Sequence, residues 1–104
     1  MVNGVAFLHG DHAETVYTFG EVQKHATQQD CWSIISGGVY NLTAFIPRHE
    51  GGPKVIIALC GIDGTASYLG QHGRSAGDDE NEPAQALARY RIGVLDPASV
   101  PKAT

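Results

Sequence analysis

Hydrophobic residues occur along this chain in short groups separated by polar residues and glycines, which predicts short helices and strands joined by tight turns. Thr18 and Glu21 have the spacing of a capping box, in which each side chain satisfies a backbone N–H at the start of a helix. Gly37-Gly38 separates two β-forming runs and suits the positive φ of a hairpin turn. The first half therefore predicts a flexible N-terminal tail over 1–16, a helix over about 19–25, and strands over 31–35 and 39–42.

Start and stop signals divide the second half in the same way. Thr43 is a candidate cap for a single helical turn over 44–46, which Pro47 is expected to end. Pro53 suits the first position of the next helix, and Gly61 suits the position after its end. The second half predicts helices over 53–60, 64–70 and 84–90, a strand over 92–95 and a C-terminal tail over 96–104.

Two histidines, His49 and His72, flank the stretch with the most distinctive chemistry. They are 23 residues apart, which is too far for one helix face, and each is expected on a loop beside glycine. The apolar run 55–59 lies between them, so the two imidazoles could face each other across an apolar slot. A flat cofactor with a central metal would fit such a slot. Haem is the candidate, because imidazole is a standard axial ligand for it.

The other three histidines predict no site. His9 and His12 lie in the expected tail, and His25 lies at the end of the first helix, where a cation suits the helix dipole. We expect all three on the surface. A metal site built from His and Cys is not indicated either, because the chain has only two cysteines and no Cys-x-x-Cys motif.

Composition narrows the class of protein. With 104 residues, 42% of them hydrophobic and 17% charged, the chain is expected to form one globular domain. Lys and Arg total 7 against 11 Asp and Glu, which argues against a nucleic-acid partner and suits a protein partner with a basic docking face. No stretch approaches the ~20 apolar residues of a membrane span, and the N-terminus has no signal-peptide pattern. We therefore expect a soluble monomer.

Six blocks of sequence follow one another in a characteristic order. They are Tyr17-Thr18-Phe19, Asp30-Cys31-Trp32, Gly38-Val39-Tyr40-Asn41-Leu42-Thr43-Ala44-Phe45, His49-Glu50-Gly51-Gly52, Gly61-Ile62-Asp63-Gly64-Thr65-Ala66 and Ile92-Gly93-Val94-Leu95. In order and spacing they resemble the cytochrome b5 haem-binding domain over about residues 17–95. The resemblance implies an α+β fold, in which a small mixed β-sheet and two helix pairs form a haem pocket.

The same resemblance implies one non-covalent haem b whose iron is bound by His49 and His72, and one-electron transfer rather than enzymatic catalysis. The residues at the family's pocket-lining positions are Phe45, Val55, Ile56, Tyr68, Leu69 and Leu87. Gly73 stands where the family often has a serine in contact with a haem propionate, which leaves Arg74 or Ser75 for that contact. The segment before His72 is about one residue shorter than in the animal proteins, which resembles bacterial members.

Two functions besides a free electron carrier remain open. One is a haem-dependent interaction or binding module, and the other is a haem domain excised from a larger redox enzyme. The acidic residues that follow the second histidine predict either a docking patch for a basic redox partner or a solvated surface. They are Asp78, Asp79, Glu80 and Glu82.

The two cysteines, Cys31 and Cys60, have two possible states. In the family's arrangement the helix that ends near Cys60 packs above the sheet that holds Cys31, so the two sulfurs could lie close together. A disulfide would indicate an oxidising compartment such as a periplasm. Two buried free thiols, which are common in protein cores, would favour the cytoplasm.

Overall fold

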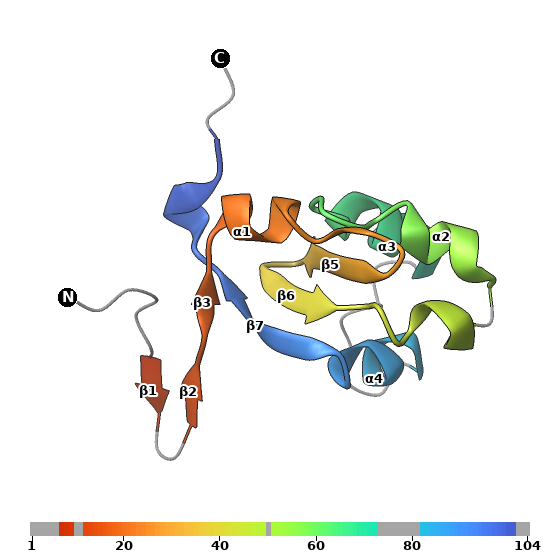
Figure 1. Cartoon of the computed structure of the whole chain (residues 1–104). Coiled ribbons are helices and arrows are strands. Elements are labelled where there is room, and N and C mark those ends of the chain that lie inside the picture. Colours follow the sequence, from red (N-terminus) through yellow and green to blue (C-terminus); the bar gives the residue numbers. More distant parts are fainter. Residues whose placement is uncertain (1–6, 10–11, 50, 73–81, 102–104) are drawn as a thin grey trace.

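The computed structural model describes residues 7–9, 12–49, 51–72 and 82–101. It contains short helices packed around a small sheet (Figure 1). The strands are β1 (Phe7–His9), β2 (His12–Glu14), β3 (Val16–Tyr17), β4 (Ala26–Thr27), β5 (Asp30–Ile35), β6 (Gly38–Asn41) and β7 (Arg91–Leu95). The α-helices are α1 (Phe19–Gln23), α2 (Pro53–Ile57), α3 (Thr65–His72) and α4 (Glu82–Ala88), and two 3-10 helices are η1 (Ile46–Arg48) and η3 (Pro97–Ser99).

The central sheet is mixed, as expected for the α+β fold. Its strand order is β3-β7-β6-β5-β4, and only the β3–β7 pair is parallel. The strands β1 and β2 form a separate antiparallel ribbon. In Figure 1, α2 and α3 lie beside β5 and α4 lies beside the start of β7, all of them away from the ribbon of β1 and β2.

The hairpin between β5 and β6 is confirmed, with its turn one residue earlier than expected. Ile35 pairs with Gly38, and the two residues between them, Ser36 and Gly37, have φ values of 50° and 83°. Positive φ at both positions is the geometry that keeps a two-residue hairpin in step with the twist of its strands. Gly38 therefore belongs to β6, where an added Cβ would lie 2.9 Å from the Tyr40 ring.

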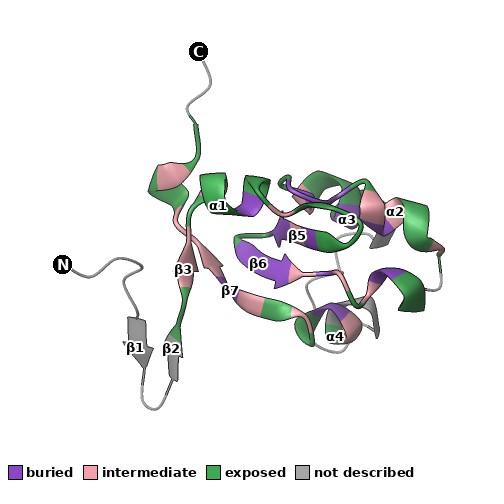
Figure 2. Ribbon diagram, in the orientation of Figure 1, coloured by how far each residue is buried: buried purple, intermediate pink, exposed green. Residues whose placement is uncertain are grey.

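Side chains that alternate along β5 and β6 build two cores, one on each face of the sheet. Ile34 and Val39 face one side and join Val22 of α1 in the α1-side core, against which Trp32 packs. The other face forms the pocket-side core, named for the cavity described below. Its buried members are Cys31, Ile35, Tyr40, Leu42, Ile46, Ile56, Cys60, Tyr68 and Leu87. Figure 2 shows the buried residues concentrated on β5 and β6 between these two layers.

The pocket-side core contains a disulfide between Cys31 and Cys60, whose Cα atoms are 4.7 Å apart. Cys31 lies on β5 and is fully buried, while Cys60 lies just beyond α2. Of the two states left open by the sequence, the structure has the disulfide. It ties the segment after α2 to the floor of the sheet.

Both chain ends depart from the expected tails. Val16 pairs with Val94 in the central sheet, and Arg91 binds Glu14 through two contacts of 2.9 Å and 3.2 Å. Near the other end, the Ser99 hydroxyl accepts a hydrogen bond from the Phe19 N–H at 2.8 Å. Glu14 and Val16 near one end and Ser99 near the other therefore make long-range contacts. The domain boundaries remain a prediction.

Local sequence signals predicted some helix ends correctly and others wrongly. The capping box of Thr18 and Glu21 is confirmed at the start of α1. Thr43 does not cap a helix. Its hydroxyl instead accepts from the Cys31 N–H at 2.9 Å and donates to the Asn41 side chain at 2.8 Å. The following turn is η1, which contains Pro47 rather than ending before it, because proline's fixed φ suits a first helical turn.

Two further helix ends differ from the expected bounds. Helix α2 starts at Pro53 as expected but ends at Ile57, earlier than Cys60. Helix α3 is longer than expected, so His72 is its last residue rather than a loop residue. Within the described residues, no helix is long and apolar enough to cross a membrane.

Candidate functional site

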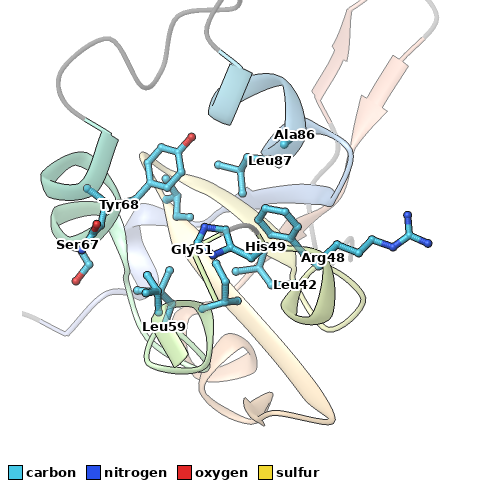
Figure 3. A pocket seen from close by; sticks show the side chains of 14 residues that line it. Leu42, Arg48, His49, Gly51, Leu59, Ser67, Tyr68, Ala86 and Leu87 are labelled. Atoms are coloured by element: carbon cyan, nitrogen blue, oxygen red, sulfur yellow. The ribbon is translucent and has the colours of Figure 1, made fainter. Parts of the chain in front are cut away.

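A pocket of about 500 Å³ opens on the pocket-side core, between η1, α2, α3 and α4. Its floor comes from the sheet side, with Ile35 on β5 and Leu42 just after β6. Most of the lining side chains are apolar, and they converge on the cavity from several elements (Figure 3). The lining residues are Ile35, Leu42, Phe45, Arg48, His49, Gly51, Val55, Ile56, Leu59, Ser67, Tyr68, Gln71, Ala86 and Leu87.

His49 lines the pocket directly after η1 and is half-buried. Its Nδ1 atom lies 3.0 Å from the Gly52 carbonyl oxygen, and its ring meets the Phe45 ring edge-on at 5.4 Å. Because a carbonyl oxygen only accepts hydrogen bonds, this contact places the imidazole proton on Nδ1. In the neutral imidazole this leaves the lone pair on Nε2, which is the arrangement found in histidines that bind metals.

The two glycines after His49 are required by this geometry. A Cβ on Gly51 would lie 2.8 Å from Cε1 of the His49 ring, so a larger residue there would displace the imidazole. Gly52 has a φ of 97°, which other residues rarely adopt, and its carbonyl is the one that holds Nδ1. The His-x-Gly-Gly sequence thus encodes both the position of the ring and its tautomer.

Helix α3 forms the opposite wall and is fixed to the sheet before it begins. Gly64 N–H donates to the Ile34 carbonyl at 2.7 Å, and the Ile34 N–H donates to the Ile62 carbonyl at 3.1 Å. The Asp63 carboxylate then accepts from the Thr65 N–H at 3.0 Å, close to the helix start that the sequence predicted. Because these contacts orient α3, its residues Ser67, Tyr68 and Gln71 line the pocket.

Tyr68 is buried in this wall. Burial raises the pKa of its hydroxyl, and the neighbouring Tyr40 adds to the shift. The hydroxyl therefore stays neutral at physiological pH. Arg48 is the residue with an always-charged side chain among the described residues that line the pocket.

The structure brings together most of the expected site residues. His49 and the expected lining residues Phe45, Val55, Ile56, Tyr68 and Leu87 all border the pocket. Leu69 does not: it is 37% exposed, because it follows Tyr68 on α3 and successive helix residues point about 100° apart. Arg74 and Ser75 lie outside the described residues, and the His72 backbone is described only as the end of α3.

Several lining residues were not predicted. Ile35 and Leu42 could have been found from the alternation of buried residues along the hairpin, because they share a face with Cys31. Gln71 could have been found from helical spacing, since Tyr68 lies three residues before it. The sequence carries no local signal for Arg48 and Ala86, which reach the pocket only through the tertiary fold.

His25 lies on the other face of the sheet. Its ring stacks on Trp32 at 3.6 Å, and its Nδ1 lies 2.7 Å from the Asp30 carboxylate. Among the described residues there is no cluster of three or more His, Cys, Asp or Glu that could hold a metal ion.

The family model for the cytochrome b5-like haem/steroid binding domain matches residues 18–96. The chain belongs to this family. Cytochrome b5 isoform B of Arabidopsis thaliana is 34% identical over 93 residues, which cover 89% of this chain and 64% of that protein. The solved structure of cytochrome b558 of Ectothiorhodospira vacuolata, a prokaryotic homologue of cytochrome b5, is 34% identical with a TM-score of 0.65. The match covers 79% of this chain and 99% of the cytochrome b558 chain.

This chain spans only part of the length of several members of the family. This chain spans 61% of the length of tobacco cytochrome b5 and 18% of the Delta(5) fatty acid desaturase A of Dictyostelium discoideum, which is 34% identical over 86 residues. Domains of the family thus occur both in cytochromes and within longer proteins. Haem b is the cofactor of the cytochrome b5 family, and the pocket fits it. The residues present offer an imidazole nitrogen for iron, apolar walls for the porphyrin and a volume typical of cofactor sites.

Proposed function

We propose that this chain is a one-electron carrier whose haem b iron is bound on its two faces by His49 and His72. The observation that carries this proposal is the placement of His49. Its ring lines an apolar pocket, and Nδ1 is engaged by the Gly52 carbonyl, so Nε2 is the nitrogen available to bind a metal. A histidine held in this tautomer at a cofactor-sized cavity is prepared to bind iron.

The second ligand is argued from the helix that carries it. His72 ends α3, and Tyr68, four residues earlier, lines the pocket. Residues four apart share one face of an α-helix, so position 72 belongs to the same side of α3 as Tyr68. We propose that His72 approaches the iron from the wall opposite His49.

The bound haem supplies an Fe(III)/Fe(II) couple that accepts and releases one electron. The residues around it decide what else can happen. With His49 and His72 both bound to it, the iron would have no open position for O2 or an organic substrate. Apolar walls formed by Val55, Ile56 and Leu87 exclude water and favour the redox state of lower net charge. We therefore propose an electron carrier and not an enzyme.

The acidic residues that follow His72 indicate what kind of redox partner the chain would bind. Asp78, Asp79, Glu80 and Glu82 come shortly after His72, and we propose that they dock a redox protein with a basic face. The first three lie outside the described residues, and the Glu82 side chain is not described. An electron-transfer rate to a basic acceptor that does not change with salt would remove this part of the proposal.

A second setting for the same chemistry comes from the desaturase relative, in which a matching domain forms a small part of a longer protein. In that setting the haem domain would pass electrons to a catalytic domain of the same chain. The role of the pocket is the same in both settings.

A spectroelectrochemical titration of the haem-loaded protein tests the proposal. The expected result is stoichiometric haem binding and a single redox transition with a slope of about 59 mV per decade, as for any one-electron couple. The His25→Ala variant serves as the control, because His25 lies on the other face of the sheet. A failure to bind haem, or a transition that needs two electrons, would contradict the proposal.

A further inference from the structure

Arg48 is unusual among the residues that line the pocket because it carries a full charge. It is exposed and ends η1, where its backbone N–H donates to the Phe45 carbonyl at 2.9 Å. Within the described residues Asp30 lies against His25 and Glu14 against Arg91, and no ion pair involves Arg48 there. In Figure 3 its guanidinium extends away from the apolar side chains, which keeps the charge at the edge of the cavity.

Haem b itself carries two propionate carboxylates, and these constrain how it can occupy the pocket. An ionised carboxylate is not tolerated against apolar walls without a charged or hydrogen-bonding partner. The apolar porphyrin edge therefore belongs at the floor, near Ile35 and Leu42, and the propionates belong at the mouth. Among the described lining residues, Arg48 is the side chain that offers a full positive charge there.

We infer that Arg48 binds a haem propionate at the mouth of the pocket. The inference rests on the proposed function and assigns a residue to the carboxylate end of the cofactor. A guanidinium suits this role because its planar N–H groups match a carboxylate in a two-point contact, and it is always charged. The position of Arg48 directly before His49 means that one turn, η1, places both the iron ligand and the propionate partner.

The test compares haem b with its dimethyl ester, in which both carboxylates are neutral. Each is loaded into the wild-type protein, Arg48→Gln, Arg48→Lys and Arg89→Gln. The last is the matched control, since Arg89 is exposed and does not line the pocket. The rate of porphyrin loss to excess apomyoglobin is then measured. Arg48→Gln should lose haem b about three- to tenfold faster than wild type, the range of a charge-assisted contact at a partly exposed site. Arg48→Lys should lose haem b at a rate between those of wild type and Arg48→Gln, because it keeps the charge without the two-point contact.

The ester separates a propionate contact from a structural effect. Loss of the dimethyl ester should be equally fast from the wild-type protein and from Arg48→Gln, and Arg89→Gln should match wild type with both porphyrins. Equal haem b loss from wild type and Arg48→Gln would overturn the inference, as would an equal acceleration with the ester. In both of those cases a normal six-coordinate spectrum would leave the proposed function standing. A wild-type protein without that spectrum would contradict the proposed function and this contact together.

Discussion

The two faces of the central sheet are built from the same strands, yet only one of them contains a pocket. The α1-side core, centred on Val22, Ile34 and Val39, is covered by α1 and closed by aromatic side chains such as Trp32. The pocket-side core is covered by four short helical segments that leave a cavity of about 500 Å³. Alternation along the strands makes both faces apolar. The covering elements determine which face can hold a cofactor.

The covering elements differ in how they are held. On the α1 side, α1 has a complete capping box and the Phe19 N–H is bound by Ser99. On the pocket side, α2 has five residues and no side-chain cap at its start. Its position depends on Pro53, on Gly52 and on the disulfide beyond its end. The pocket-side helices are therefore the part of the fold that we expect to depend most on the cofactor and on the disulfide.

The largest effect should come from removing the proposed iron ligands on the pocket side. We expect His49→Ala and His72→Ala each to lose the six-coordinate spectrum and to bind haem at least about tenfold more weakly, since even the partners of metal ligands can matter that much. His25→Ala should keep both, because His25 stacks on Trp32 on the other face. Visible spectra and haem titrations measure both properties. A normal spectrum in His72→Ala would show that the second ligand is another residue.

Reduction of the disulfide should act mainly on the pocket side. Because the bond joins residues 29 apart, the chain-entropy model predicts a loss of about 3.6 kcal/mol in the free energy of unfolding. Haem loss should also speed up, since the segment after α2 is released from β5. Urea unfolding and haem-transfer rates, measured with and without dithiothreitol, test this.

The double variant Cys31→Ala/Cys60→Ala is the control for reduction, because it should not respond to the reductant. A free-thiol count on the unfolded, unreduced protein should find no reactive thiol. Two reactive thiols would show that the bond is absent and would favour a reducing compartment, whereas a stable disulfide is what an oxidising compartment would allow.

A matched pair of truncations compares packing on the two faces. Ile34→Ala removes a side chain that is 1% exposed in the α1-side core, and Ile56→Ala removes one that is 5% exposed beside the pocket. In the haem-free protein Ile34→Ala should lower the free energy of unfolding by about 2–5 kcal/mol. Ile56→Ala should lower it by about 1–2 kcal/mol less, because the surroundings of Ile56 already include a cavity. Haem should reduce this difference by filling the pocket. Equal costs without haem would contradict the contrast between the faces.

The smallest effect concerns the Tyr68 hydroxyl. Its pKa is raised by burial, with a further contribution from Tyr40. The unfolded chain therefore releases this proton at a lower pH than the folded protein does. The contribution of the neutral Tyr68 to the free energy of unfolding is complete below the unfolded pKa of about 10 and is lost as pH rises above it. Tyr68→Phe should show a shallower loss of stability above that pH in urea unfolding. An identical slope in both proteins would show that Tyr68 does not contribute.

The sequence was a good guide wherever a structure depends on neighbouring residues. The capping box of α1, the start of α2 at Pro53 and the β5–β6 hairpin all rest on contacts within a few positions. Thr43 was misjudged because its hydroxyl binds the Cys31 N–H, a partner that is distant in sequence. The strand at Val16 was missed for the same reason, since it exists only through its pairing with β7.

The residues of the site also divide into those that a local motif predicts and those that only the tertiary fold brings together. The His-x-Gly-Gly motif and the family resemblance led to His49, and the pocket includes Phe45 and Tyr68 as expected. Leu69 was expected there but is exposed, because it follows Tyr68 on α3 and successive helix residues point about 100° apart. Arg48 was overlooked because it is close to the cavity only once η1 has folded.

The most direct test of the central claim, a haem with histidine on both faces, is the spectrum of the reduced protein under carbon monoxide. We expect a sharp Soret band and split α and β bands that carbon monoxide leaves unchanged at neutral pH, because the proposed ligands His49 and His72 would leave no open position on the iron. A rapid shift of the Soret band on addition of carbon monoxide would show an open position on the iron and would contradict the account.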